Sequence, residues 1–263
     1  MFHGSAEGLI LKIVTYGEAD LLVWVLTPEF GPLRVLARKG LRSVKRFGGR
    51  IFLFNRLEFD YSRRRDDEIA FIESARLVEI FPGVFTDEVR FGRAALFAEV
   101  LLAAWGEGDP APEACGFYLE FLRKLERGVQ SADRFVLDAF RLLEILGHRP
   151  VLDRCASCEK PLDGSKMYSV NEGGAVCENC AKDEKIKMTG RGGTLPFAVT
   201  AAVRKTVEKS YNTDPGHLDR LKFSAKARVE AFDLWIEHIK ALLGRTPKCI
   251  RYLSEFERTS KRK

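Results

Sequence analysis

Four cysteines, arranged as two Cys-x-x-Cys pairs, constrain the fold of this chain more than any other feature. Cys155 and Cys158 form the first pair, and Cys177 and Cys180 form the second after eighteen intervening residues. Because each pair forms a tight turn that directs two sulfurs toward one point, this spacing predicts a tetrahedral zinc site. Four thiolates leave no position for a catalytic water, so the predicted zinc ion is structural. The alternatives are disulfides, four unrelated thiols, or a thioredoxin-like redox pair that leaves one motif unexplained.

The segment between the two pairs predicts a short β-hairpin. Residues 167–170 and 173–176 are strand-like, and residues 171–172 supply the turn. Pro150 ends the preceding helical pattern. We therefore expect a zinc ribbon over residues 151–185, inserted between helices.

The composition is typical of a soluble globular protein, with 46% hydrophobic and 30% charged residues among 263. The start of the chain does not resemble a secretory signal. The longest apolar stretch, residues 94–105, contains Glu99 and is too short to span a bilayer, so we expect no membrane association. Cys115 and Cys249 lie outside the motif and are predicted to be small buried residues. Unpaired or metal-bound cysteines indicate a reducing cytoplasm.

The first part of the chain reads as β-strands. The predicted strands are residues 8–15, 21–27, 32–38, 51–61 and 69–77. Within the fourth, Leu57, Phe59 and Tyr61 alternate with acidic residues, which predicts one buried and one solvated face. Five short strands with closely spaced turns indicate a small closed barrel such as an OB-fold. An SH3-like barrel would give nearly the same pattern.

After Phe81 the apolar residues recur at three- and four-residue steps, which predicts helices. The predicted helices are residues 86–105, 112–125, 131–146, 201–209 and 225–243. Their apolar stripes indicate a bundle core rather than a cofactor site. The expected fold class is α+β, with an antiparallel barrel (OB-fold) in residues 1–80. A mostly α-helical domain follows in residues 81–253 and carries the inserted ribbon, and a basic tail over residues 254–263 is expected to fray.

The net charge of +6 is unevenly distributed. One segment holds seven cations and no acidic residue: Arg34, Arg38, Lys39, Arg42, Lys45, Arg46 and Arg50. Such a cluster attracts polyanions through phosphate contacts, so these residues are candidate DNA-binding residues. Phe47 lies within the same loop, where it can either stack on bases or anchor the loop. Arg56 and residues 63–65 can extend the cationic surface, whereas the basic tail is expected to be merely solvated.

An enzymatic function finds little support in the sequence. The four histidines lack paired metal-ligand spacing, and neither a phosphate-binding loop nor a nucleophile elbow is present. Residues 190–193 read as a flexible connector rather than a phosphate cradle. We therefore expect a non-catalytic nucleic-acid-binding protein. The alternatives are a zinc-ribbon transcription or translation factor without annealing activity, and an enzyme with an unrecognised site.

Several segments together resemble the RecO family of bacterial recombination mediators. The matching segments are Glu18–Val23 with Thr27 and Phe30–Gly31, Ala37–Gly40, Arg46–Gly49, Pro150–Cys155 with the later cysteine pair, and Pro247–Leu253. They occur in the family's order and span nearly the whole chain. The resemblance implies an N-terminal OB-fold followed by a helical domain with the zinc element.

The resemblance also implies a function in recombinational DNA repair by the RecF pathway. A RecO-like protein is expected to bind single- and double-stranded DNA and to anneal complementary strands. With RecR, it helps to load RecA onto DNA coated by single-strand-binding protein, whose acidic C-terminal tail is a further expected partner. The implied location is the bacterial cytoplasm, in association with the nucleoid.

Overall fold

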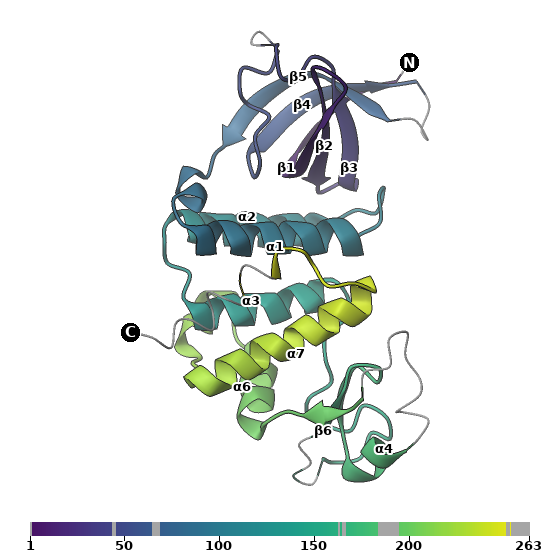
Figure 1. Cartoon of the computed structure of the whole chain (residues 1–263), viewed down its shortest axis with the longest axis vertical. Helices are drawn as coiled ribbons and strands as arrows, with labels where there is room; N and C mark the ends of the chain where they lie inside the picture. The colour runs from purple at the N-terminus through teal and green to yellow at the C-terminus, as the bar shows by residue number, and fades with distance from the viewer. Residues whose placement is uncertain are drawn as a thin grey trace. The chain divides into compact units, whose positions relative to one another are not determined.

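The computed structural model of the chain describes residues 2–43, 46–64, 69–162, 164, 167–183, 195–250 and 253. The chain divides into two compact units, Met1–Val129 and Gln130–Lys263. The first unit contains the five barrel strands and the first two α-helices, and the second contains the later helices and the cysteine module (Figure 1). This division by compactness falls between α2 and α3, whereas the sequence division at residue 80 follows the change from strands to helices.

Five strands form a closed barrel in the first unit. They are β1 (Phe2–Tyr16), β2 (Asp20–Thr27), β3 (Gly31–Ala37), β4 (Arg56–Arg63) and β5 (Ala70–Glu79). Their order around the barrel is β1-β2-β3-β5-β4. The β3–β5 pair is parallel and the other pairs are antiparallel. This is the strand order of an OB-fold. The predicted OB-fold is therefore confirmed, and the barrel is not SH3-like.

Strand β1 is longer than its sequence pattern indicates, because it serves two neighbours. Its first half, from Phe2 to Leu9, pairs with β4, and its second half, to Tyr16, pairs with β2. The register with β2 shifts between Ile10 and Lys12, where an irregularity bends the strand. This double pairing lets one strand close the barrel.

The predicted fourth strand, residues 51–61, is wrong in its first half. Phe54 adopts a φ of 68°, a left-handed conformation that bulky residues rarely occupy and that ends any extended run. Asn55 holds the turn, since its Nδ2 donates to the carbonyl oxygen of Arg50 at 2.9 Å. Strand β4 therefore begins only at Arg56. The predicted alternation is confirmed within it, because Leu57, Phe59 and Tyr61 are buried.

The interior of the barrel is filled by one cluster of mostly aliphatic side chains. Its members are Ala6, Ile10, Leu21, Val23, Val25, Val35, Ala37, Phe47, Ile51, Leu57, Phe59, Tyr61, Ala70, Ile72 and Ala75. Most come from alternate positions of the strands, as period-two geometry requires. Phe47 and Ile51 come instead from the connection between β3 and β4, which therefore packs into the barrel.

A short 3₁₀ helix, η1 (Pro82–Phe85), leads into α1 (Glu88–Ala104) and α2 (Pro112–Glu126). The N-cap of α1 is Asp87, one residue after the predicted Thr86, and its Oδ1 accepts hydrogen bonds from the backbone of Val89 and Arg90. A carboxylate satisfies two free N–H groups and also complements the helix dipole.

The connection between α1 and α2 covers one end of the barrel. The backbone N–H of Ala111 donates to the carbonyl oxygen of Pro28 at 2.8 Å, in the turn between β2 and β3. Gly31 opens β3 with a φ of 59°, and a Cβ there would lie 2.4 Å from the carbonyl oxygen of Asp109. Only glycine suits both this backbone and this close approach. The other end of β3, at Ala37, lies a full strand length away from this connection.

The second unit is built around α3 (Ala132–Ile145), α6 (Ala201–Tyr211) and α7 (Ala225–Leu243), with a 3₁₀ turn, η2 (Pro215–Arg220). The predicted hydroxyl N-caps Ser131, Thr200 and Ser224 are confirmed, and Gly244 ends α7 at a φ of 65°. Trp235 joins α7 to α3, since its Nε1 donates to the carbonyl oxygen of Ala139 at 2.7 Å. Within the described part of the chain, no helix has the length and apolarity needed to cross a membrane.

Candidate nucleic-acid interface and metal centre

The cysteine module is a small three-stranded sheet with a short helix between its second and third strands. It contains β6 (Met167–Ser169), β7 (Gly174–Val176), α4 (Glu178–Lys182) and β8 (Phe197–Ala198), with strand order β7-β6-β8. The predicted hairpin of residues 167–176 is confirmed with shorter strands. The third strand was not predicted, because two residues are too few to carry a periodic signal. The expected connector at residues 190–193 lies outside the described residues.

The module brings the four predicted ligands together. The sulfurs of Cys155, Cys158, Cys177 and Cys180 all lie within 4.8 Å of one another, although the two pairs are far apart in sequence. The Cys158 and Cys177 sulfurs are 3.8 Å apart. A tetrahedral ion with metal–sulfur bonds of about 2.3 Å requires sulfur–sulfur separations of about 3.8 Å. The four cysteines can therefore hold a metal ion.

Backbone groups favour the thiolate form of Cys155. The backbone N–H of Cys177 donates to the Cys155 sulfur at 3.3 Å, and that of Cys180 donates to the Cys177 sulfur at 3.5 Å. Burial raises the pKa of the Cys155 thiol, but backbone hydrogen bonds from Cys158, Cys177 and Ser157 outweigh it and lower the pKa to about 6. The thiolate is the form that binds metal.

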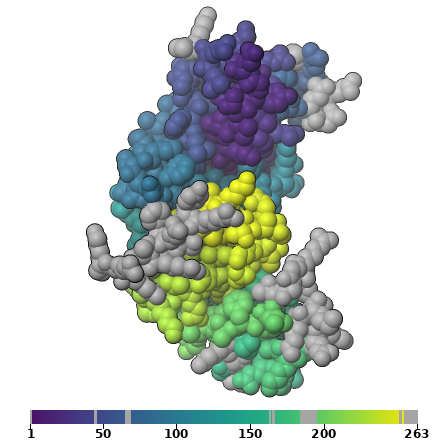
Figure 2. Space-filling model, viewed as in Figure 1, coloured from purple at the N-terminus to yellow at the C-terminus, as the bar shows by residue number. Residues whose placement is uncertain are grey.

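A buried polar contact joins the module to the helices of its unit. The hydroxyl of Tyr168, on β6, is hydrogen-bonded to Nε2 of His238, on α7, and the two rings meet edge to face at 5.4 Å. Burial, and secondarily the charge of His148, lowers the pKa of His238 to about 4, so this imidazole is neutral at neutral pH. The surface of the module adjoins that of α7 in the space-filling view (Figure 2). Sequence alone gave His238 no role, because its partner is seventy residues away.

Most of the predicted DNA-binding cations gather at the barrel end opposite the α1–α2 connection. Arg46 donates through Nη2 to the carbonyl oxygen of Arg38 at 2.6 Å, and the backbone of Arg42 donates to that of Lys39 at 3.0 Å. Arg50 donates through Nη1 to the carbonyl oxygen of Arg46 at 3.3 Å. The β3–β4 connection thus folds back on itself and presents its cations as one group.

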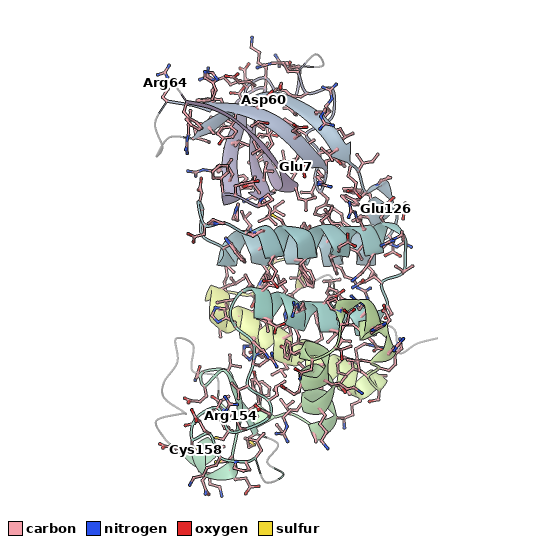
Figure 3. All side chains as sticks on the ribbon, turned by 180° about the vertical axis from the view of Figure 1, so that it is seen from behind. Glu7, Asp60, Arg64, Glu126, Arg154 and Cys158 are labelled. Atoms are coloured by element: carbon pink, nitrogen blue, oxygen red, sulfur yellow. The ribbon has the colours of Figure 1, made fainter. Side chains whose placement is uncertain are left out.

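The start of β5 and the end of β4 extend this group. The guanidinium of Arg38 lies 4.2 Å from the ring centroid of Phe71, and Phe71 is paired in register with Ser62. Residues Arg63 and Arg64 follow Ser62 directly, and Figure 3 shows Arg64 at this end of the barrel. We call the set Arg38, Lys39, Arg42, Arg46, Arg50, Arg63 and Arg64 the basic end.

Most of the predicted cations that the structure describes are not neutralised by carboxylates. Among the described residues, Arg34, Arg38, Lys39, Arg42, Arg46 and Arg50 form no ion pair with an acidic side chain. Arg56 differs, because it contacts both Glu7 and Glu79, and the expected contribution of Arg56 to the cationic surface is therefore wrong. Lys45 and Arg65 lie outside the described residues.

Phe47 takes the second of the two roles left open for it. Its side chain is only 1% exposed and belongs to the barrel core. The Arg46 guanidinium lies 5.0 Å from its ring centroid. Phe47 therefore anchors the basic loop and holds Arg46 in place, rather than presenting a ring to a ligand.

Arg34 lies on a different part of the barrel, in the middle of the outer wall. It is paired in register with Trp24 on β2, and Trp24 is paired with Lys12 on β1, so the three side chains point to one face. The Lys12 ammonium lies 4.6 Å from the Trp24 ring centroid. Trp24 is only partly buried there. No local sequence signal places Lys12 and Trp24 beside Arg34, because the register between strands decides which residues become neighbours.

Fold and site together define a class of protein: a five-stranded barrel with a basic end, joined to a helical unit that carries four clustered cysteines able to hold a metal ion. Two family models cover nearly all of the chain. The model described as "Recombination protein O N terminal" matches residues 1–81, and "Recombination protein O C terminal" matches residues 86–249. The chain belongs to the RecO family.

Similar proteins cover most of the chain. The DNA repair protein RecO of Syntrophus aciditrophicus (strain SB) is 28% identical over 97% of this chain and 96% of its own length. The DNA repair protein RecO of Anaeromyxobacter dehalogenans (strain 2CP-C) is 30% identical over 94% of each chain. The protein of the same name from A. dehalogenans (strain 2CP-1 / ATCC BAA-258) is 31% identical over 74% of this chain and 77% of its own.

Proposed function

We propose that this protein is a non-catalytic mediator of recombinational DNA repair that binds DNA strands and anneals them. The observation that carries the proposal is the basic end of the barrel, where Arg38, Lys39, Arg42, Arg46 and Arg50 form no ion pair with an acidic side chain among the described residues. Unpaired arginines and lysines gathered at one end attract polyanions and release counterions when phosphates bind. Family membership supports DNA repair as the setting.

The basic end supports annealing by reducing the repulsion between two strands. Two single strands approach each other against the charge of their phosphates. Contacts from Arg38, Arg42 and Arg46 would neutralise part of that charge while leaving the bases free to pair. No bond is made or broken in this process, so the proposal needs no general base or nucleophile.

The outer wall of the barrel supports binding of single strands. OB-folds bind oligonucleotides on the sheet face that includes strands 2 and 3, which is the face of Trp24 and Arg34. An aromatic ring beside two cations can stack on a base while the cations contact the adjacent phosphates. We propose Trp24 as the stacking residue of this surface, with Lys12 and Arg34 as its phosphate contacts.

For the metal centre we propose one structural zinc ion held by the four cysteines. Thiolate ligands with this spacing suit zinc, and a complete tetrahedral shell leaves no open position for catalysis. The ion would fix the hairpin of β6 and β7, and thereby keep Tyr168 against His238. The metal then supports the helical unit and takes no part in DNA chemistry.

The protein partners follow from family membership. We propose that RecR and the C-terminal tail of single-strand-binding protein bind this chain, and that RecA is loaded through this assembly in the cytoplasm. A strand-annealing assay tests the proposal: complementary oligonucleotides, labelled for energy transfer, are mixed with and without single-strand-binding protein. Faster annealing in both conditions supports it. No acceleration, or a clear preference for structured RNA over random DNA, would favour a transcription or translation factor instead.

A further inference from the structure

A pocket of about 400 Å³ lies between the metal module and helix α6. Its apolar wall includes Leu152 and Leu162, which flank the first cysteine pair in sequence and are both buried. The opposite wall is one face of α6, with Arg204, Lys205 and Lys209. The size is within the range of small-ligand sites, and the lining combines apolar surface with a few polar groups, as such sites do.

Arg204 is a buried cation without a hydrogen-bond or ion-pair partner among the residues that the structure describes. Its side chain is 8% exposed, and the enclosed Nε has no hydrogen-bond acceptor. No described residue forms an ion pair or side-chain hydrogen bond with its guanidinium. Burial lowers the pKa of Arg204, with no compensating acidic group. Since a buried charge is costly unless it is paired, this side chain is suited to an anion from outside the chain.

The two acidic residues at the pocket do not fill this role, because each contacts a different arginine. Glu208 lies 3.3 Å from Arg149, and Asp153 lies 3.3 Å from Arg154. The helix adds Lys205 and Lys209 beside Arg204, both exposed and neither paired with an acid among the described residues. Three separate cationic groups therefore line one wall, opposite an apolar one.

We propose that this pocket binds the phosphate group of a nucleotide, with Arg204, Lys205 and Lys209 as the phosphate ligands. A phosphate monoester carries about two negative charges and three acceptor oxygens, which match three donors from separate side chains. A carboxylate has fewer oxygens and a single charge, and would leave at least one of these cations unpaired. The planar guanidinium of Arg204 suits bidentate contact with phosphate.

The nucleoside would lie against Leu152 and Leu162, where apolar walls accommodate a sugar or base. Choosing a nucleotide over other phosphate esters rests on the proposed function, because a DNA-binding protein meets strand ends and free nucleotides. Both sources present the same chemistry, a phosphate monoester on a nucleoside. The pocket would therefore hold either a free nucleotide or the 5′-phosphate of a strand end.

The test uses the metal-loaded full chain and isothermal titration calorimetry with inorganic phosphate, deoxyadenosine monophosphate and deoxyadenosine. We expect saturable binding of the nucleotide, weaker binding of inorganic phosphate, and none of the nucleoside. A short oligonucleotide with a 5′-phosphate is then compared with the same strand lacking it. Tighter binding of the phosphorylated strand indicates strand ends as the source, and equal binding indicates free nucleotide.

Two variants connect the binding to the pocket. R204M removes the charge but keeps much of the volume, so we expect an unchanged or higher melting temperature and at least a tenfold loss of nucleotide affinity. K205Q/K209Q alters only exposed side chains and should also weaken nucleotide binding, which keeps the test valid if R204M fails to fold. Affinity of both variants for an unphosphorylated single strand should be unchanged, so failure here is distinct from failure of the barrel proposal.

Three results would overturn the inference. The first is absence of saturable nucleotide binding, and the second is nucleotide binding that both variants retain. The third is Arg204-dependent binding of an acidic peptide in place of the nucleotide, which would assign the pocket to a protein partner.

Discussion

At the scale of single residues, a buried ion pair within α3 should make the stability of the helical unit sensitive to substitution. Arg134 and Asp138 are almost completely enclosed, and Nε of Arg134 lies 2.9 Å from Oδ1 of Asp138. Gln130 donates to the other carboxylate oxygen at 2.8 Å. Removing Asp138 leaves the buried guanidinium with the solvent-screened carboxylate of Asp219 as its remaining acidic contact, which costs far more than the pair itself contributes.

We predict that D138A lowers the free energy of unfolding by about 3–5 kcal/mol. Asp219 offers a matched control, because it also contacts Arg134, at 3.0 Å, but its side chain is 59% exposed. D219A should cost less than about 1 kcal/mol, since solvent screens an exposed pair. Urea denaturation followed by circular dichroism measures both, and similar losses in the two variants would contradict the assignment.

His238 predicts a pH dependence of stability. Its pKa of about 4 in the folded protein lies below the usual value of 6.5, so the unfolded chain binds the proton more readily. Stability is therefore fully present above about pH 6.5 and falls as the pH drops toward 4. From about pH 7.5 to about pH 5 the loss due to this residue should be about 2 kcal/mol.

The variant H238Q serves as its control. Glutamine can still bond the Tyr168 hydroxyl but does not titrate, whereas any thiolate protonation at the metal centre affects both proteins alike. The wild type should lose about 2 kcal/mol more than H238Q over this interval. Equal losses in urea titrations would mean that the imidazole carries no depressed pKa.

At the scale of elements, we expect the hairpin of β6 and β7 to depend on the proposed metal ion more than on its own core. Strands β6 and β7 have three residues each, too few to be stable alone. We predict that chelation removes hydrogen-exchange protection from residues 167–183 and from the part of α7 around His238. The barrel strands should keep their protection. Protection that persists in the module after complete metal removal would contradict a structural role.

The zinc content of two cysteine variants tests the same structural metal site. C158S removes one of the four clustered sulfurs, whereas C249S alters a cysteine outside the cluster. The wild type and C249S should contain one zinc ion per chain, and C158S should contain markedly less. Iron in place of zinc, or no metal in the wild type, would refute the assignment.

The proposed stacking surface on β1, β2 and β3 predicts a difference between single-stranded and duplex DNA binding. Replacing Trp24 by leucine should weaken single-stranded DNA binding by about 1–3 kcal/mol, because stacking on a base is lost. Duplex binding should change much less, since paired bases offer no free face. The control is V14A, which shortens an exposed apolar side chain on the neighbouring strand β1. Fluorescence anisotropy with both kinds of DNA measures this, and equal effects on both would exclude stacking.

The sequence predicts elements well where a local signal exists. Hydroxyl caps such as Ser224 locate helix starts, and the alternation of Leu57, Phe59 and Tyr61 identifies a barrel strand. Prediction from the sequence fails where contacts between distant segments determine the local conformation or the neighbours of a residue. The turn at Phe54 has no local signature, and the pairing of Lys12 with Trp24 depends on strand register. The clustering of the four cysteines was predictable because it follows from the spacing of two Cys-x-x-Cys pairs.

At the scale of the whole molecule, the distribution of charge carries the function. A net charge of +6 is modest, and many arginines, such as Arg76 beside Glu58, are engaged with carboxylates. At the basic end, Arg38, Lys39, Arg42, Arg46 and Arg50 are different, because they form no ion pair with a carboxylate among the described residues. What matters for binding DNA is therefore which charges remain unpaired, a property that composition does not reveal.

The most direct test of this account is the salt dependence of single-stranded DNA affinity in two quadruple variants. R38Q/K39Q/R42Q/R46Q removes unpaired cations of the basic end, and R76Q/R141Q/R154Q/K240Q removes four cations that each contact a carboxylate. Both lose the same formal charge. The first should bind more weakly and lower the slope of log affinity against log salt by about three, while the second keeps the wild-type slope. Equal slopes in the wild type and the first variant would contradict the proposed interface.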